Sequence, residues 1–398
     1  MKKPLVIDAD THVFEPIENL DKYLEQPYKY RSPRVFRDQW GIIRVLMEGR
    51  LYPDPSITVY DAHEKIRDHH HSHNHHHGPH EHDSEAHEHH DSQGEEKGLL
   101  EGVAMAMRRQ GVNNPEARIK DMDIEGIDIQ ILLGSLCLAA CTLRDRGFAL
   151  AFCKACNDYV AEFCSAFPDR LKGVAVVPLQ DVPAAIAEAR RAVKELGLIG
   201  VSIPPSLPGK NLDDSTFHPF YAAIQELNVP IGIHWGNGTY LPAAGTDRFN
   251  KHFFTHVVGH PFEQMIALMS LVCGGVLASF PKLKFGFLES GCGWLPYMMW
   301  RLDEEYHGRS LEVPLIKDKP SEYIKGGQCF ISCSPDEDLI PTVAGLAGSD
   351  IIMFSSDYPH ADGLFPESVS TINNRSDISA DLKRKILGDN AGRFYNLL

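Results

Sequence analysis

Apolar runs of strand length recur along the chain, and segments long enough for a helix separate them. Short apolar runs of this kind are typical of buried strands in a parallel sheet, because both faces of such a strand are covered. Eight runs fit the description: LVIDA at 5–9, IDIQILL at 127–133, GVAVVPL at 173–179, GLIGVSI at 197–203, VPIGIHW at 229–235, LKFGFLE at 283–289, QCFISC at 328–333 and IIMFSS at 351–356.

The segments between these runs have helical character. Residues 184–196 carry apolar side chains at helical spacing. The longest apolar stretch, 265–280, contains Ser270, Gly274 and Gly275 and is too short to span a bilayer, so we expect a buried helix there. Eight strand–helix units predict an α/β fold, the (β/α)8 TIM barrel. A doubly wound open sheet is the alternative, but no GxGxxG motif follows an early strand.

The gap between the first and second runs is too long for a single helix. We therefore expect an insertion after the first strand, over residues 13–115. It contains a tract at 69–90 that holds 12 of the 21 histidines and has no periodicity, which predicts a mobile loop. Imidazoles bind Zn²⁺, Ni²⁺ and Cu²⁺. The tract is either a metal-collecting loop or a tolerated surface insertion.

Composition narrows the class of protein. The chain has 398 residues, enough for one large α/β barrel over 1–398 or for two ordinary domains, and its 43% hydrophobic and 23% charged residues are typical of a soluble globular protein. The formal charge of -15 argues against nucleic acid and anionic membranes as partners. No secretory signal is visible, because Asp8 breaks the first apolar run. Nine cysteines scattered through apolar segments predict reduced thiols, and hence a cytoplasmic protein.

Ionisable residues follow four of the apolar runs, at the strand ends where the active sites of such barrels lie. The first run leads to Asp10 and His12, and later runs lead to His234, Glu289 and Asp357. A single ionisable residue after a strand is weak evidence. Five of them at the same end of four strands predict a shared site.

The residue types of this set point to a metal ion. Asp10 and His12 are two positions apart, so on a strand their side chains point to the same side. With His234 and Asp357 they offer two imidazoles and two carboxylates. Such a set suits one Zn²⁺ or Mn²⁺ ion, and also Fe²⁺, but is too rich in nitrogen for Ca²⁺. A divalent cation would also compensate the cost of burying the carboxylates.

Longer motifs carry a family resemblance: DADTHVFEP, ARIKDMDIEGID, PDRLKGVAVVPLQD, IGIHWG, FLESGCGWLPYMMWRLDE, SSDYPH and NAGRFYNLL. With them the chain resembles, nearly end to end, the amidohydrolase-related family that includes aminocarboxymuconate semialdehyde decarboxylase and the resorcylate decarboxylases. The resemblance implies a TIM barrel with one divalent metal ion, and it suggests a homodimer.

Carried over by position, the resemblance implies that Asp10, His12, His234 and Asp357 hold the metal. The family often has HxH in its first strand and some decarboxylases have ExH, so Asp10 favours manganese over zinc. The decarboxylases place a histidine where this chain has Glu289. A glutamate can replace it as general acid or base if burial raises its pKa toward neutrality.

Two mechanisms fit these residues. In a decarboxylase, the metal binds the substrate carboxylate and an adjacent hydroxyl, Asp357 or Glu289 protonates the ring carbon, and CO₂ leaves. In a hydrolase of a C–N, C–O or C–C bond, metal-activated water attacks the substrate with help from the same two residues. We favour a decarboxylase that acts on a small carboxylated ring or unsaturated acid. A metal-storage or metal-delivery protein that uses the histidine tract is the non-enzymatic alternative.

Four further residues are candidates for substrate contact. His260 precedes a proline, which predicts a position at the start of a helix, and His360 follows Asp357 closely. Arg301 could pair with a substrate carboxylate through two hydrogen bonds, although an ion pair with a nearby acidic residue is equally compatible. Trp294 could form an aromatic wall for a planar substrate, although core packing is the ordinary role of a tryptophan.

Overall fold

Strands form at all eight predicted positions, and each ladder that joins consecutive ones is parallel. The computed structural model describes residues 4–38, 43–52, 109–234, 243–360 and 362–398. Its central strands are β1 (Ile7–Val13), β5 (Ile129–Gly134), β6 (Leu171–Gly173), β7 (Ala175–Val176), β8 (Val201–Ile203), β11 (Ile231–Ile233), β12 (Phe285–Phe287), β13 (Cys329–Cys333) and β14 (Ile352–Phe354).

The strands pair in the order of the sequence. One sheet is β1–β5–β6, and a second is β7–β8–β11–β12–β13–β14, with only Val174 between β6 and β7. No ladder joins β14 to β1 within the described ranges. The two strands are nevertheless linked just beyond the end of β14, where the His12 amide donates to Tyr358 O (2.7 Å) and Ser355 Oγ donates to Asp10 O (3.1 Å). The order is the one expected when each strand is followed by a helix and pairs with the next.

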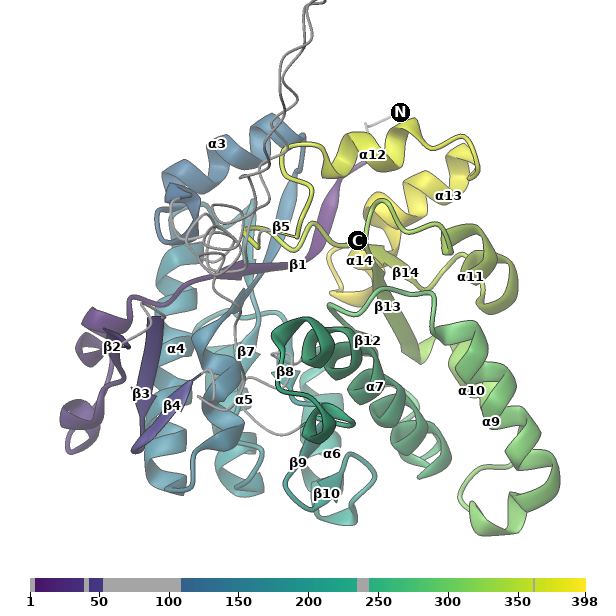
Figure 1. The fold of residues 1–398 in the computed structure, drawn as a ribbon, viewed down its shortest axis with the longest axis horizontal. Helices are drawn as coiled ribbons and strands as arrows, with labels where there is room; N and C mark the ends of the chain where they lie inside the picture. The colour runs from purple at the N-terminus through teal and green to yellow at the C-terminus, as the bar shows by residue number, and fades with distance from the viewer. Residues whose placement is uncertain (1–3, 39–42, 53–108, 235–242, 361) are drawn as a thin grey trace, which may run out of the picture.

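Helices surround the strands (Figure 1). The predicted helix at 184–196 is confirmed as α5, which begins after Asp181, whose carboxylate accepts from the Ala184 amide (3.2 Å) as an N-cap. The helices are α3 (Pro115–Glu125), α4 (Arg146–Ser165), α5 (Val182–Lys194), α6 (His218–Leu227), α7 (His252–Cys273), α8 (Val276–Ser279), α9 (Leu295–Arg309), α10 (Pro320–Tyr323), α11 (Ile340–Ala347), α12 (Ser368–Asn374), α13 (Ala380–Arg384) and α14 (Asn390–Phe394).

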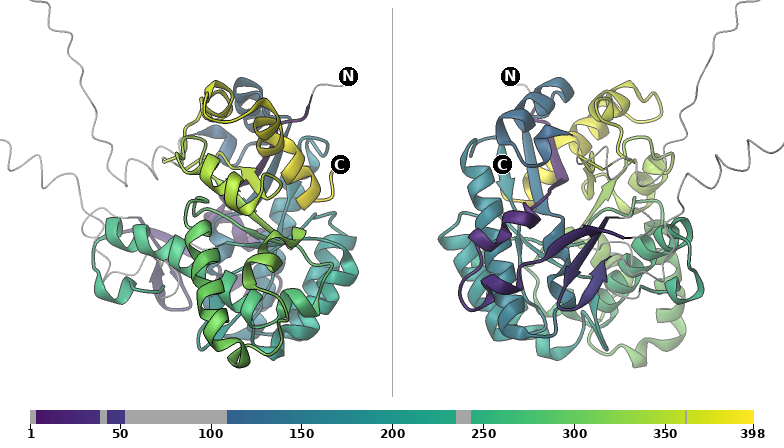
Figure 2. Two further views of the ribbon diagram at one scale, coloured as in Figure 1. Left: turned by 90° about the vertical axis from the view of Figure 1, so that its right-hand side faces the viewer. Right: turned by 60° about the vertical axis from the view of Figure 1, so that its left-hand side comes forward.

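The region between β1 and β5 contains a small antiparallel sheet that the apolar pattern did not predict. It is formed by β2 (Arg34–Arg37), β3 (Ile43–Met47) and β4 (Arg50–Tyr52), and it lies beside α4 (Figures 1 and 2). Met47 and Tyr52 pack in one apolar cluster with Phe148 and Phe152 of α4. The histidine tract at 69–90 lies outside the described residues.

The apolar interior agrees with two expectations: reduced cysteines, and a buried helix in the longest apolar stretch. All nine cysteines are free, and all except Cys273 are buried. The stretch at 265–280 forms the second half of α7 and then α8, with Leu268, Leu271 and Val272 fully buried. Among the described helices, none combines the length and the apolar character needed to cross a bilayer.

Candidate metal centre and active-site pocket

Asp10 and His12 lie on β1, where every residue is buried. The ladder between β1 and β5 shifts register between Asp8 and Thr11, which marks a bulge or irregularity next to these two side chains. Asp8 has a separate set of partners, because its carboxylate accepts from the amide of Ser356 (3.0 Å) and from its hydroxyl (2.5 Å). Asp8 therefore joins β1 to the segment after β14, and Asp10 is the carboxylate that faces His12.

Three predicted ligands meet at one point. Asp10 Oδ1 lies 3.5 Å from His234 Nε2 and 3.9 Å from His12 Nε2, and His12 Nε2 lies 3.6 Å from Asp357 Oδ1. Asp10, His12 and His234 can each offer one ligand atom to a common metal ion, and so can His12, Asp357 and His360. The structure thus brings three of the four residues predicted to hold the metal to one point, and it places the fourth, Asp357, beside His12.

These side chains lack the hydrogen-bond partners that buried polar atoms normally have, as expected for a site that binds a cation. Both oxygens of Asp10 and both ring nitrogens of His12 and His234 are buried and form no hydrogen bond of regular geometry with a described residue, although Glu289 Oε2 approaches His234 Nε2 to 2.8 Å. Buried polar atoms are normally paired, because leaving them unpaired costs about 1–3 kcal/mol each. Two imidazoles and carboxylates at these separations are a donor set for a divalent transition metal ion. The residues present therefore fit one such ion.

The electrostatic environment also attracts positive charge. Burial lowers the pKa of His234, but the carboxylates of Asp10 and Glu289 outweigh it and hold this pKa well above its usual range. Burial, together with the imidazoles of His360 and His234, lowers the pKa of His12 well below its usual range. His12 is therefore neutral at pH 7, which is the form of histidine that binds a metal.

Glu289 and Asp357 occupy strained backbone positions at the ends of β12 and β14. Their φ angles are +52° and +53°, in the left-handed region that costs a residue with a side chain about 1–2 kcal/mol. Three contacts hold Glu289 there: its amide donates to Ser332 Oγ (3.0 Å), its carbonyl lies 2.8 Å from His260 Nδ1, and its Oε2 lies 2.8 Å from His234 Nε2. Such strain is a feature of functional sites.

A pKa raised toward neutrality was the condition for Glu289 to act as a general acid or base, and the net shift of this pKa is in the opposite direction. Burial does raise this pKa, but the surrounding imidazoles of His234, His260 and His360 lower it by more, to well below the usual range. His360 is the counterpart. Burial lowers its pKa, but Asp357 Oδ1, 2.8 Å from Nδ1, and Glu289 raise it to about 10. Of these two residues, the one that carries a proton at pH 7 is therefore His360.

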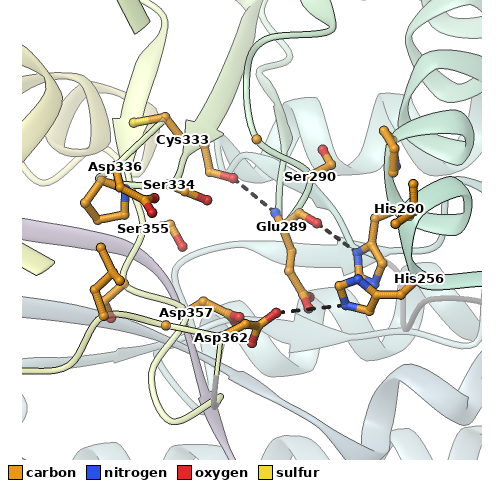
Figure 3. A pocket seen from close by; sticks show the side chains of 18 residues that line it. His256, His260, Glu289, Ser290, Cys333, Ser334, Asp336, Ser355, Asp357 and Asp362 are labelled. Atoms are coloured by element: carbon orange, nitrogen blue, oxygen red, sulfur yellow. Dashed lines mark hydrogen bonds and ion pairs between the residues drawn. The ribbon is translucent and has the colours of Figure 1, made fainter. Parts of the chain in front are cut away.

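A pocket of about 420 Å³ opens beside the carboxylates of Glu289 and Asp357 (Figure 3). Glu289, Asp357 and His260 line it. The apolar pattern missed several polar residues in its wall, because most of them lie in loops where no periodicity fixes the direction of a side chain. They are Ser290, Ser334, Asp336, Ser355, Ser356 and Asp362, together with Ser332 on β13.

Two of the residues predicted to contact the substrate, Arg301 and Trp294, lie outside the lining of this pocket. Arg301 is exposed on α9 and pairs with Glu305, and it is not among the residues that line the pocket. Trp294 is buried against Phe287, its Nε1 donates to Gly291 O (3.0 Å), and it does not line the pocket either. His260 was expected at the start of a helix, which is wrong because α7 continues through Pro261.

A second group of possible ligands, Glu15, Cys137 and Cys156, lies in the apolar interior. Both oxygens of Glu15 already accept backbone hydrogens, from the amides of Leu136 (2.8 Å) and Cys137 (3.0 Å). This carboxylate therefore has a complete structural role at the start of the segment after β5, in contrast to the unpaired carboxylate of Asp10.

Comparison with known proteins identifies the family of this site. A family model described as amidohydrolase matches residues 7–397, which is nearly the whole chain. The chain belongs to the amidohydrolase family. The predicted resemblance is confirmed, and with it the prediction that the chain is an enzyme of this superfamily. The family and the solved structures described below also assign the parallel strands of this chain to the TIM-barrel fold.

The similar proteins include several decarboxylases. A 2-amino-3-carboxymuconate-6-semialdehyde decarboxylase of Dictyostelium discoideum is 30% identical over 71% of this chain and 77% of its own length. A gamma-resorcylate decarboxylase of Rhodococcus jostii is 29% identical over 61% of this chain and 77% of its own length.

Solved structures agree on the fold. A crystal structure of an amidohydrolase from Mycobacterium avium subsp. paratuberculosis superposes with a TM-score of 0.74 over 99% of this chain and all of its own, at 22% identity. A dihydroxybenzoic acid decarboxylase of Polaromonas with bound manganese and an inhibitor superposes with a TM-score of 0.60 at 26% identity. It covers 70% of this chain and 85% of its own.

Proposed function

We propose that this protein is a divalent-metal-dependent carboxy-lyase that releases CO₂ from a small carboxylated ring or unsaturated acid. The observation that carries the proposal is the cluster of buried, unpaired ligand atoms of Asp10, His12 and His234 beside the acidic pocket. The decarboxylases among the similar proteins support this reaction over others that the family fold can host.

In this proposal Asp10, His12, His234 and Asp357 hold one ion, and that ion is manganese. Two observations support manganese over zinc: the first-strand pair contains an acid in place of a histidine, and a relative with 26% identity contains bound manganese. When bound, the ion would stabilise negative charge on the substrate carboxylate and on an adjacent oxygen.

Glu289 and Asp357 are the acid–base residues of the proposed reaction. As the C–C bond to the carboxylate breaks, its electron pair stays on the ring carbon, which takes a proton, and CO₂ departs. Glu289 lines the pocket, and its Oε2 lies 2.8 Å from Nε2 of the proposed metal ligand His234. Asp357 is the alternative donor, because His360 Nδ1 lies 2.8 Å from its Oδ1 and holds a proton at pH 7.

Direct substrate contact is proposed for two of the four predicted residues. His260 lines the pocket, and His360 lies 4.5 Å from the ring of His12, measured between ring centroids. For Arg301 and Trp294 the positions described above support structural roles, an ion pair on α9 and packing against Phe287.

A screen for turnover tests the proposal. Purified protein loaded with Mn²⁺ should release CO₂ from at least one member of a panel of hydroxybenzoates and cyclic or unsaturated carboxylic acids. The alternative is a metal-dependent hydrolase, which would use water as a reactant, as does a similar hydratase of Sphingobium, 28% identical over 58% of this chain. Uptake of ¹⁸O from labelled water without CO₂ release would favour that alternative and contradict decarboxylation.

The remaining alternative is metal storage or delivery by the histidine tract. A variant that lacks 69–90 separates it from catalysis. We expect this variant to keep full turnover at saturating Mn²⁺. Loss of all turnover at saturating metal would favour the storage role.

We further propose that the eight strands close into a (β/α)8 barrel with an insertion at 13–115, and that the enzyme is a cytoplasmic homodimer. The links from His12 and Asp10 to the segment after β14 support closure. Free thiols support a reducing compartment. Exposed aromatic side chains, 71% for Phe253 on α7 and 57% for Trp300 on α9, support a protein–protein contact there.

A further inference from the structure

Three histidines follow one another on α7 at intervals of four residues: His252, His256 and His260. Side chains four residues apart lie on the same face of a helix. The ring centroids of His252 and His256 are 5.3 Å apart, and those of His256 and His260 are 5.0 Å apart. The rings therefore form a row that leads from the first residue of α7 to the pocket, which His256 and His260 line.

The first two rings of this row are open to solvent, unlike the ligands of the candidate metal centre. His252 is half-buried, and the side chain of His256 is 40% exposed. Neither ring forms a hydrogen bond within the part of the chain that the structure describes. Burial, together with the imidazoles of His256 and His260, lowers the pKa of His252 to about 4, so this ring is neutral at pH 7 and keeps a lone pair for a cation.

A carboxylate approaches the same pair from another element. Asp362, in the loop after β14, places its Oδ2 4.0 Å from Nε2 of His256 (Figure 3). Two atoms that bind one Zn²⁺ ion lie about 3–4 Å apart, because each lies about 2 Å from the ion. The observed separation is at the upper end of this range. The side chain of Asp362 is 65% exposed, so a change of its rotamer can bring it closer.

The mouth of the pocket also favours a cation, and in particular zinc. The described residues of the lining include no lysine and no arginine, but four acidic residues: Glu289, Asp336, Asp357 and Asp362. A concave wall of one sign of charge raises the local concentration of ions of the opposite sign. Two imidazoles and a carboxylate prefer Zn²⁺ to Mn²⁺, because affinity for such a ligand set rises along the series from manganese to copper and zinc.

We propose that His252, His256 and Asp362 form a second metal site, selective for Zn²⁺ over Mn²⁺, which ties the start of α7 to the loop after β14 at the mouth of the pocket. The site shares no ligand with the candidate metal centre. His260 contributes no ligand to it, because its Nε2 is buried and its Nδ1 lies 2.8 Å from the carbonyl oxygen of Glu289. The proposal does not depend on the reaction that the enzyme catalyses.

Anomalous diffraction tests the position of the ion. A crystal of the manganese-loaded protein is soaked in Zn²⁺, and data are recorded just above and just below the zinc absorption edge. The difference between the two data sets should show a zinc peak about 2 Å from ring nitrogens of His252 and His256. Zinc found only elsewhere, or bound to one of these imidazoles without the other, overturns the proposal.

Thermal unfolding tests the same site in solution. With Mn²⁺ at saturation, added Zn²⁺ should raise the melting temperature, because an ion that binds the folded chain stabilises it. In His252→Asn, which removes one imidazole, the Zn²⁺ concentration that gives half of this rise should increase at least about tenfold. His307→Asn is the matched control and should behave like the wild type, because His307 is an exposed histidine of α9 with no histidine one turn away.

The comparison isolates the pair on α7. Zinc bound by the histidine tract at 69–90 is common to the wild type and the variants, so it cannot account for a difference between them. His256→Asn should show the same loss, and it decides the question if His252→Asn does not fold. No rise in melting temperature in the wild type, or an unchanged zinc dependence in the folded variants, overturns the site. Zinc binding here without CO₂ release from any compound keeps the site and rejects the decarboxylase.

Discussion

Arg118 on α3 is fully buried behind the candidate metal centre and holds β1 in place. Its Nε donates to Gly111 O (2.7 Å), its Nη1 to Gln130 Oε1 (3.1 Å), and its Nη2 to the carbonyl of His12. The guanidinium lies 4.3 Å from the centroid of the Tyr358 ring. In Arg118→Met these three acceptors would stay buried and lose their donor.

The size of the effect follows from these contacts. Three buried acceptors without donors cost about 3–9 kcal/mol at 1–3 kcal/mol each. Part of this is offset, because the guanidinium has no carboxylate at ion-pair distance among the described residues, and removing a buried charge relieves its desolvation cost. A net loss of about 3 kcal/mol lowers the melting temperature of a chain of 398 residues by about 4 °C. Loss of the tether on His12 should weaken manganese binding about 10–100-fold.

Thermal unfolding and a Mn²⁺ titration measure both effects. Arg170→Met is the control, because Arg170 also makes three hydrogen bonds, to Asp128 O (2.6 Å), Ile127 O (2.9 Å) and Asp123 Oδ1 (2.9 Å). These bonds go to residues that precede β5, none of them to β1, and they are partly buried or exposed, so we expect a smaller drop in melting temperature and unchanged metal affinity. An Arg118→Met variant that binds Mn²⁺ as tightly as the wild type would refute the claim that Arg118 positions His12 for the metal.

Three more predictions follow from the site. Asp357→Asn should lower CO₂ release at least about 100-fold at saturating Mn²⁺, and full activity would remove Asp357 from the catalytic residues. Ser332→Ala frees the Glu289 amide and should lower kcat about fivefold with KM and metal affinity unchanged; an equal change in KM would argue against a positioning role. Burial lowers the pKa of His260 to about 4 from 6.5. Below pH 6.5 the unfolded chain therefore binds more protons than the folded one, and stability falls as the pH drops toward 4. Urea unfolding at pH 7 and pH 5 should show about 2 kcal/mol less acid destabilisation in His260→Asn than in the wild type, and an identical pH dependence would contradict this pKa.

The strands and the shared end of the sheet could be predicted because both depend on short-range pattern. A buried parallel strand must be apolar throughout, and this pattern identified Ile231–Ile233 and the other central strands. Polar residues at the end of such a strand need partners that offset the cost of their burial. Asp10, His12, His234, Glu289 and Asp357 became candidates in this way, from their positions at the ends of the predicted apolar runs.

Other parts depend on contacts between distant segments. The direction of the Asp336 and Asp362 side chains depends on loop geometry, and the sheet of β2–β4 depends on packing against α4. His260 was placed at a helix start because proline usually ends a helix, but α7 tolerates Pro261 in its interior. The net direction of the Glu289 pKa depends on three imidazoles from other elements, so burial alone gave the opposite sign.

The central claim is that one divalent ion is held between β1, β11 and β14. Diffraction from a crystal of the protein grown with Mn²⁺, recorded for anomalous scattering, tests it most directly. The account predicts one strong peak about 2 Å from side-chain atoms of Asp10, His12 and His234. Peaks only elsewhere, with ordinary hydrogen bonds completing those three side chains, would contradict it.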